Sequence, residues 1–373
     1  MPMETDSATL FAKFLEDDIL DEMGRLLYSI LNVFATNGYR IKLSDNIDFS
    51  ALDKYGQLVP SMSNLELVET IPDNSSDLLY LFDREDKSCS RKQWRKKIQI
   101  RFDIFSTYRI NNPIFMPYTV HPLLSGTDLP LQLETLRKNE KRLRIFFSGD
   151  TKGYTKNRIH YPNTKIPRLE VIGTILTRMP DAAIYVKDEA ELRRLFADGF
   201  VDRCVIVDTS RLWIDPKDWL PHLSKTDFFI CPPGYVMPMC HNVIEAMAVG
   251  AIPIINYPEW FNPTLEHMEN CIVFDDKNDL IRKIEDVLEM GQEDISEMRS
   301  KVINYYENHL NPRTFISDIE SRTEKKITVL MITDRNTIKN ASTLNAKSIL
   351  ISGKPTLSSG VWHKLFAPFR NQG

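Results

Sequence analysis

The hydrophobic pattern of the chain alternates between short apolar runs and longer stretches with apolar residues three or four positions apart. Short apolar runs predict buried strands, and the helical spacing predicts amphipathic helices. In the second part of the chain, strands are predicted at 143–148, 182–186, 204–207, 228–230, 251–255 and 271–274. Helices are predicted at 166–179, 189–200, 239–249, 280–290 and 296–310. This alternation predicts a parallel sheet covered by helices, an α/β fold.

The first part of the chain follows the same pattern. Apolar residues at helical spacing predict a helix over 15–37 that Gly38 ends. The polar stretch 61–77 is expected to be mostly loop. Further strands are predicted at 39–43, 77–82, 97–105, 113–117 and, near the end of the chain, 326–333.

The length of the chain predicts more than one domain, because 373 residues are too many for a single core. A charged, polar stretch at 129–142 has the character of an interdomain link. We therefore expect an N-terminal Rossmann-like domain at 1–135 and a second domain at 136–322. Residues 323–373 are expected either to pack on the first domain or to begin a further module.

The stretch Thr226–Asn256 carries the strongest chemical signal. It predicts a strand, a turn, a helix and a second strand, a βαβ unit with a right-handed crossover. Such sheets bind ligands outside the carboxyl ends of their strands, and a helix N-terminus there favours an anion. Glu245 lies one helical turn beyond His241 and away from the apolar stripe of this helix. We expect Glu245 to be free to meet a ligand.

Residues 231–255, CPPGYVMPMCHNVIEAMAVGAIPII, resemble the nucleotide-sugar-binding segment of GT-B glycosyltransferases and are most similar to the exostosin-like family. The resemblance implies two Rossmann-like domains that face each other across a cleft. It implies that Glu245 holds the donor ribose hydroxyls and that the loop at Gly234 and Tyr235 lies against the pyrophosphate. Many retaining GT-B enzymes have an acid eight positions before this glutamate, where this chain has Met237. The difference favours an inverting enzyme.

An arginine near the first strand of the second domain is expected to bind the donor phosphates. By resemblance to the first βα unit of the family's C-terminal domain, Arg158 is the best match. A guanidinium can bind two oxygens of the departing diphosphate together. Lys152, Lys156 and Arg168 compete with Arg158 for this role.

Further donor contacts are expected just past the ends of other predicted strands and at the start of the helix 239–249. In the resembling enzymes, the loop after the strand 251–255 helps to shape the sugar pocket. These candidates are Lys187, Asp208, Ser210, His241, Asn242 and Glu259.

An inverting transfer also needs a general base that removes the proton of the acceptor hydroxyl. Asp83 directly follows the predicted strand 77–82, at the carboxyl edge where α/β sites form. His121 follows the predicted strand 113–117 at a short distance. Both are candidate bases in the first domain.

Composition limits the classes of partner. The net charge of −4 is nearly balanced and does not indicate the basic surface that nucleic-acid binding requires. The five cysteines and the scattered acids form no metal-binding pattern, so we expect no cofactor and no metal. A basic-then-apolar signal peptide and an apolar run of about 20 residues are both missing from the sequence, which favours a cytoplasmic protein. Peripheral membrane contact through 91–101 or 361–370, which mix basic and aromatic residues, stays an alternative to a solvated surface.

The sequence therefore predicts a GT-B glycosyltransferase that moves a sugar from a nucleotide-sugar donor to a glycan or lipid-linked glycan acceptor. Inverting, metal-independent transfer in the synthesis of a surface polysaccharide or glycoconjugate is the leading hypothesis. A retaining GT-B enzyme is the nearest alternative. A GT-B sugar-nucleotide epimerase would act on the donor alone, and a non-catalytic subunit would bind the nucleotide without turnover.

Overall fold

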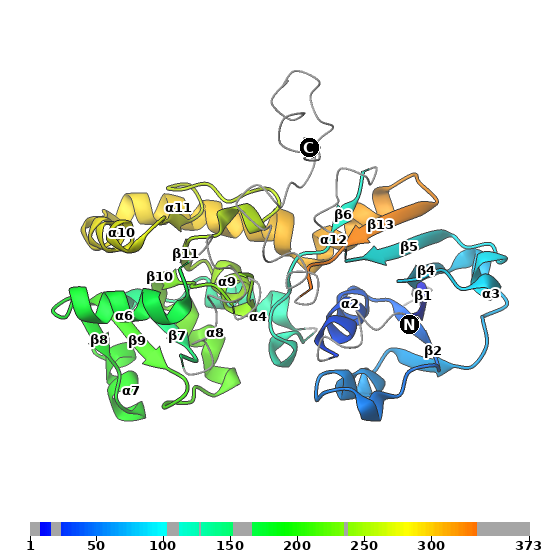
Figure 1. Cartoon of the computed structure of the whole chain (residues 1–373), viewed down its shortest axis with the longest axis horizontal. Coiled ribbons are helices and arrows are strands. Elements are labelled where there is room, and N and C mark those ends of the chain that lie inside the picture. Colours follow the sequence, from blue (N-terminus) through cyan, green and yellow to red (C-terminus); the bar gives the residue numbers. More distant parts are fainter. Residues whose placement is uncertain are drawn as a thin grey trace, which may run out of the picture.

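The structure, a computed structural model, describes residues 8–15, 24–102, 112–126, 128–151, 166–234 and 238–333. Within these residues the chain forms two β-sheets with helices around them (Figure 1). All pairs of neighbouring strands in both sheets are parallel. The predicted α/β fold with two Rossmann-like halves is confirmed.

The first sheet has the spatial strand order β3-β2-β1-β4-β5-β13-β6. Its strands are β1 (Thr9–Lys13), β2 (Arg40–Ser44), β3 (Leu65–Val68), β4 (Leu79–Phe82), β5 (Lys96–Arg101), β6 (Ile114–Phe115) and β13 (Lys326–Leu330). The helices beside it are α2 (Arg25–Thr36), α3 (Lys87–Ser90) and α12 (Pro312–Ser321). Short 3₁₀ turns are η1 (Phe49–Ala51), η2 (Gly56–Ser61), η3 (Ser75–Asp77) and η5 (Pro122–Leu124). We call these elements the first half.

The two faces of the first sheet are covered in different ways. Successive strand residues point to opposite faces, so Leu10 packs with α2 and α12 whereas Phe11 points the other way. On that second face Phe11, Tyr80 and Trp94 stack, with ring centroids 5.4 Å apart for Phe11–Trp94 and 4.6 Å for Tyr80–Trp94. Burial on both faces explains why the central strands are apolar at successive positions.

The second sheet has the spatial strand order β12-β11-β10-β7-β9-β8. Its strands are β7 (Leu143–Gly149), β8 (Ala183–Tyr185), β9 (Val201–Asp208), β10 (Thr226–Ile230), β11 (Ile252–Ile255) and β12 (Ile272–Val273). Its helices are α6 (Arg168–Arg178), α7 (Glu189–Ala197), α8 (Pro216–Ser224), α9 (His241–Ala248), α10 (Lys277–Glu289) and α11 (Gln292–Tyr305), with the 3₁₀ turn η7 (Pro258–Trp260) after β11. We call these elements the second half.

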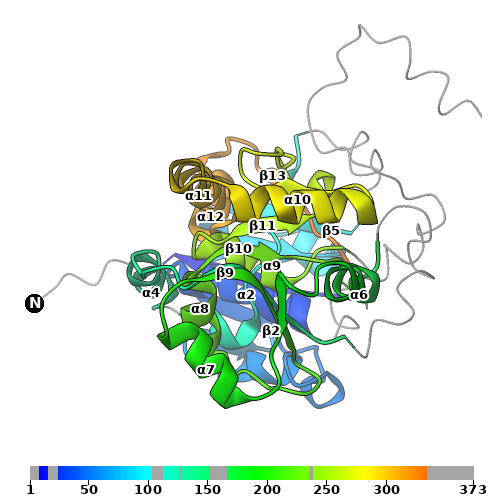
Figure 2. The same ribbon diagram turned by 90° about the vertical axis from the view of Figure 1, so that its left-hand side faces the viewer.

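The helices of the second half lie in two layers. α6 packs against α10, and α8 packs against α9. Figure 2, seen from the second half, shows α10 on one side of the sheet and α7 and α8 on the other. This division follows from right-handed crossovers, because the connection from β7 to β8 and the connections from β9 to β11 run in opposite directions across the sheet.

Within the described ranges, the chain passes between the halves twice. The first passage leads from β6 through η5 and α4 (Leu129–Leu136) to β7, and the second leads from α11 through the π-helical turn η8 (Tyr306–Leu310) to α12. α12 packs on α2 and β6. Arg95 holds the end of α12 with two 2.8 Å hydrogen bonds to the Glu320 carboxylate, and Lys96 Nζ donates to the carbonyl oxygens of Ile319 at 2.8 Å and Glu320 at 2.7 Å. A lysine that satisfies terminal carbonyls stabilises a helix end.

Several features of the structure differ from or add to the elements expected from the sequence. β1 was not predicted, and β3 lies inside the stretch 61–77 that was expected to be mostly loop. Both strands are too short to show a period, and sheet neighbours determine their conformation. β13 lies between β5 and β6, so the described part of the expected extension 323–373 belongs to the first sheet. α12, inside the expected second domain 136–322, packs on the first half.

The proposed membrane-contact segment 91–101 supplies structural contacts. Trp94 is buried in the aromatic stack, and Arg95 and Lys96 bind α12. The other segment, 361–370, lies outside the described residues. No helix in the described ranges combines the length and the apolar character needed to span a membrane.

Candidate functional site

The second sheet changes direction between β7 and β10. The chain continues from β7 to one side of the sheet, through α6 to β8, and from β10 to the other side, through α9 to β11. At such a switch point the connections leave on opposite faces and open a crevice at the carboxyl edge, where α/β proteins bind ligands. The end of β7, the end of β9 and the start of α9 meet at this edge, and we take it as the candidate site.

Asp208 joins the ends of β7 and β9. Its Oδ2 accepts a hydrogen bond from Thr151 Oγ1 at 2.7 Å, and its Oδ1 accepts one from the backbone N–H of Ser210 at 3.0 Å. Burial raises the pKa of Asp208, but these hydrogen bonds outweigh that effect and lower it. The site therefore holds an ionised carboxylate in a fixed position, able to accept hydrogen bonds from ligand hydroxyls.

The start of α9 lies beside this corner and has no side-chain cap. Cys240 at the N-cap position makes no capping hydrogen bond of normal geometry. Burial raises the pKa of its thiol, while the charge of Arg168 and the nearby N–H groups of Val243 and Asn242 counteract this effect, and a thiol is a weak acceptor. Asn242 Nδ2 donates to the carbonyl oxygen of Ser148 at 3.2 Å, which ties the helix start to the end of β7. In the preceding loop, the Gly234 N–H donates to the Pro238 carbonyl oxygen at 2.9 Å. An uncapped first turn favours an anion.

Two histidines lie edge to face where the halves meet, with ring centroids 5.2 Å apart. His241 Nδ1 lies 2.6 Å from the carbonyl oxygen of Thr119, which can only accept, so Nδ1 carries the hydrogen. His121 has the opposite arrangement: its Nδ1 accepts from the backbone N–H of Leu123 at 3.2 Å, so its Nε2 donates to the hydroxyl oxygen of Tyr55 at 2.8 Å. Burial, then Arg25 and Lys54, lowers the pKa of His121 to about 4, so the ring is neutral. In this tautomer Nε2 already carries a proton, which disfavours His121 as the general base.

Glu245 does not point freely into the crevice. Its side chain is 2% exposed, Oε1 accepts from the backbone N–H of His121 at 2.9 Å, and Oε2 accepts from Trp219 Nε1 at 2.6 Å. Burial raises the pKa of Glu245 to about 7 in spite of these two hydrogen bonds. The expectation that Glu245 is free to meet a ligand is wrong, because the first passage between the halves and α8 both pack on its side of the helix.

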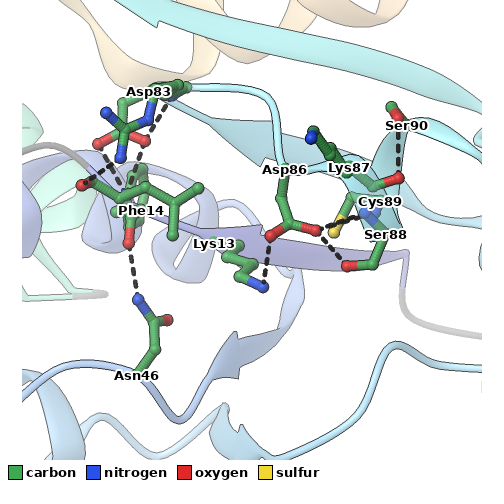
Figure 3. Close-up of polar contacts among 11 residues, drawn as sticks. Lys13, Phe14, Asn46, Asp83, Asp86, Lys87, Ser88, Cys89 and Ser90 are labelled. Atoms are coloured by element: carbon green, nitrogen blue, oxygen red, sulfur yellow. Dashed lines mark hydrogen bonds and ion pairs between the residues drawn. The ribbon is translucent and has the colours of Figure 1, made fainter.

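Asp83, at the carboxyl end of β4, holds the backbone that follows β1 (Figure 3). Its carboxylate accepts from the Leu15 N–H at 2.9 and 3.1 Å and from the Arg84 N–H at 2.6 Å. Asp86, on the same loop, caps α3 and pairs with Lys13 at 3.2 Å. The carboxylates of Asp83 and Asp86 therefore have separate partners.

Among the remaining predicted residues, Arg168 lies close to the start of α9, where burial raises the pKa of the Cys240 thiol and the charge of Arg168 counteracts this effect. Lys187 is exposed, and its backbone N–H donates to Glu191 Oε2 at 2.9 Å at the start of α7. Glu259 is half-buried in η7, after the carboxyl end of β11. Arg158, Tyr235, Lys152 and Lys156 lie outside the described residues. Arg168, a competitor of Arg158, is buried at the start of α6 and donates to the Asp150 carbonyl oxygen at 3.2 Å.

Two residues at the site were not predicted from the sequence. They are Ser148, whose carbonyl oxygen accepts from Asn242, and Thr151, whose hydroxyl donates to Asp208. Ser148 Oγ is buried and has no hydrogen-bond partner in the described part of the chain. The sequence feature that could have pointed to Ser148 and Thr151 is their position just after an apolar run, at the carboxyl end of a predicted strand.

Two cavities lie between the halves. The larger, about 240 Å³, is lined by residues of α2 and its cap Asn37, residues 119–126, α4, Ile244 of α9, η8 and the start of α12. These walls belong mostly to the two passages between the halves and lie on the α4 side of α9. The smaller, about 30 Å³, is lined by Arg25 and Ser29 of α2, residues 115–119, Met239, His241 and residues 331–332. It adjoins the candidate site through His241.

No family model and no curated protein sequence matches the chain. Among solved structures, a glycosyltransferase from Rickettsia africae is similar with a TM-score of 0.47 and 9% identity over 84% of this chain and 97% of its own. Anabaena Alr3699/HepE in complex with UDP has a TM-score of 0.45 and 11% identity over 84% and 98% of the two chains. An alpha-glucosyltransferase in complex with UDP and DNA has a TM-score of 0.43 and 14% identity over 84% and 98%. Structural similarity at these TM-scores does not show the activity of this protein.

Proposed function

We propose that the protein is a GT-B glycosyltransferase, most similar to the exostosin-like group, that transfers a sugar from a nucleotide-sugar donor. The observation that carries this proposal is the set of groups at the switch point of the second sheet. The uncapped start of α9 lies beside the buried Ser148 hydroxyl, which has no partner among the described residues, and the ionised Asp208 is one strand away. Buried polar groups are normally paired, so this set suits a ligand that carries both phosphate and hydroxyl groups.

We assign the donor diphosphate to the first turn of α9 and the loop at Gly234. Negative charge develops on the diphosphate as it departs, and helix N–H groups stabilise it. Arg158 and Tyr235 keep the phosphate-binding roles that the resemblance implies. Asp208 is our preferred partner for the ribose hydroxyls, since Glu245 would first have to give up a hydrogen bond to His121 or Trp219.

Nucleotide binding tests the proposal directly. One of UDP, GDP, CMP and ADP is expected to raise the melting temperature of the wild type, because a ligand at about 100 times its Kd adds about 2.7 kcal/mol of stability. Asp208→Asn is expected to reduce this shift. Asp198→Asn, at an exposed carboxylate that ends α7, serves as the control. A wild type whose melting responds to none of the four nucleotides would refute the proposed donor site.

For the general base we prefer Asp83 to His121, because His121 Nε2 carries a proton. Asp83 is 4% exposed, so to act as the base its carboxylate would have to exchange its hydrogen bonds to the Leu15 and Arg84 N–H groups for the acceptor hydroxyl. Asp83→Asn is expected to lower kcat by about 100-fold or more, the usual loss for a general base, while nucleotide binding is retained. Asp86→Asn, on the same loop but bound to Lys13, is expected to leave kcat within about threefold of the wild type, since the half-buried pair lies on the α3 side of the loop and asparagine can still cap α3. Similar losses in the two variants would show that Asp83 acts by holding the loop and not as a base.

The acceptor is proposed to be a glycan or lipid-linked glycan, and the pathway the synthesis of a surface polysaccharide or glycoconjugate. Inverting, metal-independent transfer in the cytoplasm completes the proposal. Product stereochemistry separates it from a retaining enzyme. Conversion of the donor without an acceptor would support the epimerase alternative, and binding without any turnover would support a nucleotide-binding subunit.

A further inference from the structure

His241 Nε2 is a buried hydrogen-bond acceptor to which the described part of the chain supplies no donor. The side chain is 8% exposed, and Tyr118 and His121 pack on the ring with centroids 4.9 and 5.2 Å away. Because Nδ1 is committed to the Thr119 carbonyl, the ring cannot turn to satisfy Nε2 without breaking that bond. An unpaired buried atom on a ring held this firmly indicates a partner that the chain itself does not provide.

The ring is also kept neutral. Burial, followed by the positive charge of Arg25, lowers the pKa of His241 to about 3. At physiological pH the lone pair on Nε2 is therefore available, and the nitrogen is a weak base. It suits acceptance of a hydrogen bond from a neutral donor better than removal of a proton.

The space beside His241 limits the size of that donor. The small cavity of about 30 Å³ has room for one water molecule or one hydroxyl group. A phosphate group is too large for it, and its oxygens would face a lone pair. Both halves contribute to the walls: Met239 and His241 from the second half, and α2 and residues 115–119 and 331–332 from the first.

We propose that His241 positions the sugar of the donor by accepting a hydrogen bond at Nε2 from one of its hydroxyl groups. This inference rests on the proposed function. His241 is the first residue of α9, whose first turn is assigned to the diphosphate. A sugar attached to that diphosphate lies within reach of the His241 side chain. The hydroxyl would then enter the cavity between the halves and be enclosed by both.

The test compares nucleotides with their sugar conjugates, using the full chain and calorimetry. The probe pairs are UDP and UDP-glucose, GDP and GDP-mannose, and ADP and ADP-glucose. For the pair that binds, His241→Ala is expected to weaken the nucleotide sugar by about 3- to 10-fold, the worth of one neutral hydrogen bond, and to leave the bare nucleotide unchanged. His241→Gln, which can place an amide oxygen near the Nε2 position, is expected to recover part of the loss.

His222→Ala is the matched control. His222 is also held through Nδ1 by a backbone carbonyl, that of Asp218 at 2.5 Å, and packs on an aromatic ring, but it lies on α8 beside Phe196. Replacement of His222 is expected to leave the affinities for the nucleotide and for the nucleotide sugar unchanged. Nitrogen-15 NMR of the histidine rings gives a second readout: His241 Nε2 is expected to be unprotonated in the free protein and to shift with the nucleotide sugar and not with the nucleotide.

Several results overturn the inference. An equal loss of both affinities in His241→Ala would mean that the ring supports the helix start, and no loss in either would mean that no sugar hydroxyl uses it; in both cases the proposed function survives. A protonated Nε2 in the free protein excludes the acceptor role whatever binds. If neither these probes nor CMP binds the wild type, the proposed function fails and this inference fails with it.

Discussion

Asp227→Asn is expected to lower the free energy of unfolding by about 3–5 kcal/mol, the usual loss when one partner of a buried ion pair is removed. Asp227 in β10 has a side chain that is 0% exposed. Arg299 of α11 donates to its Oδ1, and Arg144 NH1 of β7 lies 3.6 Å from its Oδ2. Burial raises the pKa of Asp227, while these arginines and Lys141 counteract the effect. Asparagine would leave Arg299 partly buried without the carboxylate that it pairs with and would remove one of the two carboxylates that Arg144 pairs with.

The control for this prediction is Asp202→Asn. Asp202 also pairs with Arg144, at 2.8 Å, but its side chain is 54% exposed. Removing an exposed partner is expected to change stability by about 1 kcal/mol or less. Urea unfolding followed by circular dichroism measures both variants. If Asp227→Asn is no more destabilising than Asp202→Asn, the buried network is not a main support of the second half.

Between pH 4.5 and pH 8 the wild type is expected to lose about 3 kcal/mol of its free energy of unfolding through Glu245, and Glu245→Gln is expected to remove this loss. Burial raises the folded-state pKa of Glu245 from 4.5 to about 7. The folded state then holds the proton more tightly than the unfolded state, so this group's contribution is fully present below about pH 4.5 and is lost as the pH rises through 7. A shift of about 2.5 units corresponds to about 3 kcal/mol. Glutamine does not titrate and lacks this dependence.

Unfolding of the wild type and Glu245→Gln at pH 5 and pH 8 measures this effect. The free energy of unfolding of the wild type minus that of the variant is expected to be smaller at pH 8 than at pH 5. His121 and His241 titrate in both proteins, so their contributions largely cancel in the difference. If the difference in the free energy of unfolding between the two proteins is the same at both pH values, the pKa of Glu245 is not raised.

The contacts of Glu245 also bear on how the halves are held. Its carboxylate binds the backbone of His121, in the first passage between the halves, and Trp219 of α8. Arg137 at the end of α4 donates to the Ala248 carbonyl oxygen at 2.8 Å and to Glu307 at 2.6 Å, which connects the first passage to α9 and to η8. Both ends of α9 therefore contact the connections between the halves. A ligand at the start of α9 would act on the same helix.

Much of the second half could be predicted from the sequence, because the evidence for each element is local. The apolar runs of β7, β9, β10 and β11 and the helical periods of α6, α9 and α10 are contained within the elements themselves. Gly250 has φ +78°, a left-handed conformation that suits glycine at the end of α9. The positions of Asp208, Ser210 and Asn242 beside the carboxyl edge followed from the same pattern, since residues just past parallel strands gather there.

Other features depend on partners distant in the sequence, and only the tertiary structure decided them. Glu245 meets the His121 N–H across 124 positions, and His241 meets the Thr119 carbonyl across 122. Helical spacing showed that Glu245 lies off the apolar stripe, but not that another part of the chain covers it. The short strand β1 and the place of β13 between β5 and β6 were determined by their neighbours in the sheet. Local periodicity determines which residues share a face, whereas burial and hydrogen bonding of that face depend on what packs against it.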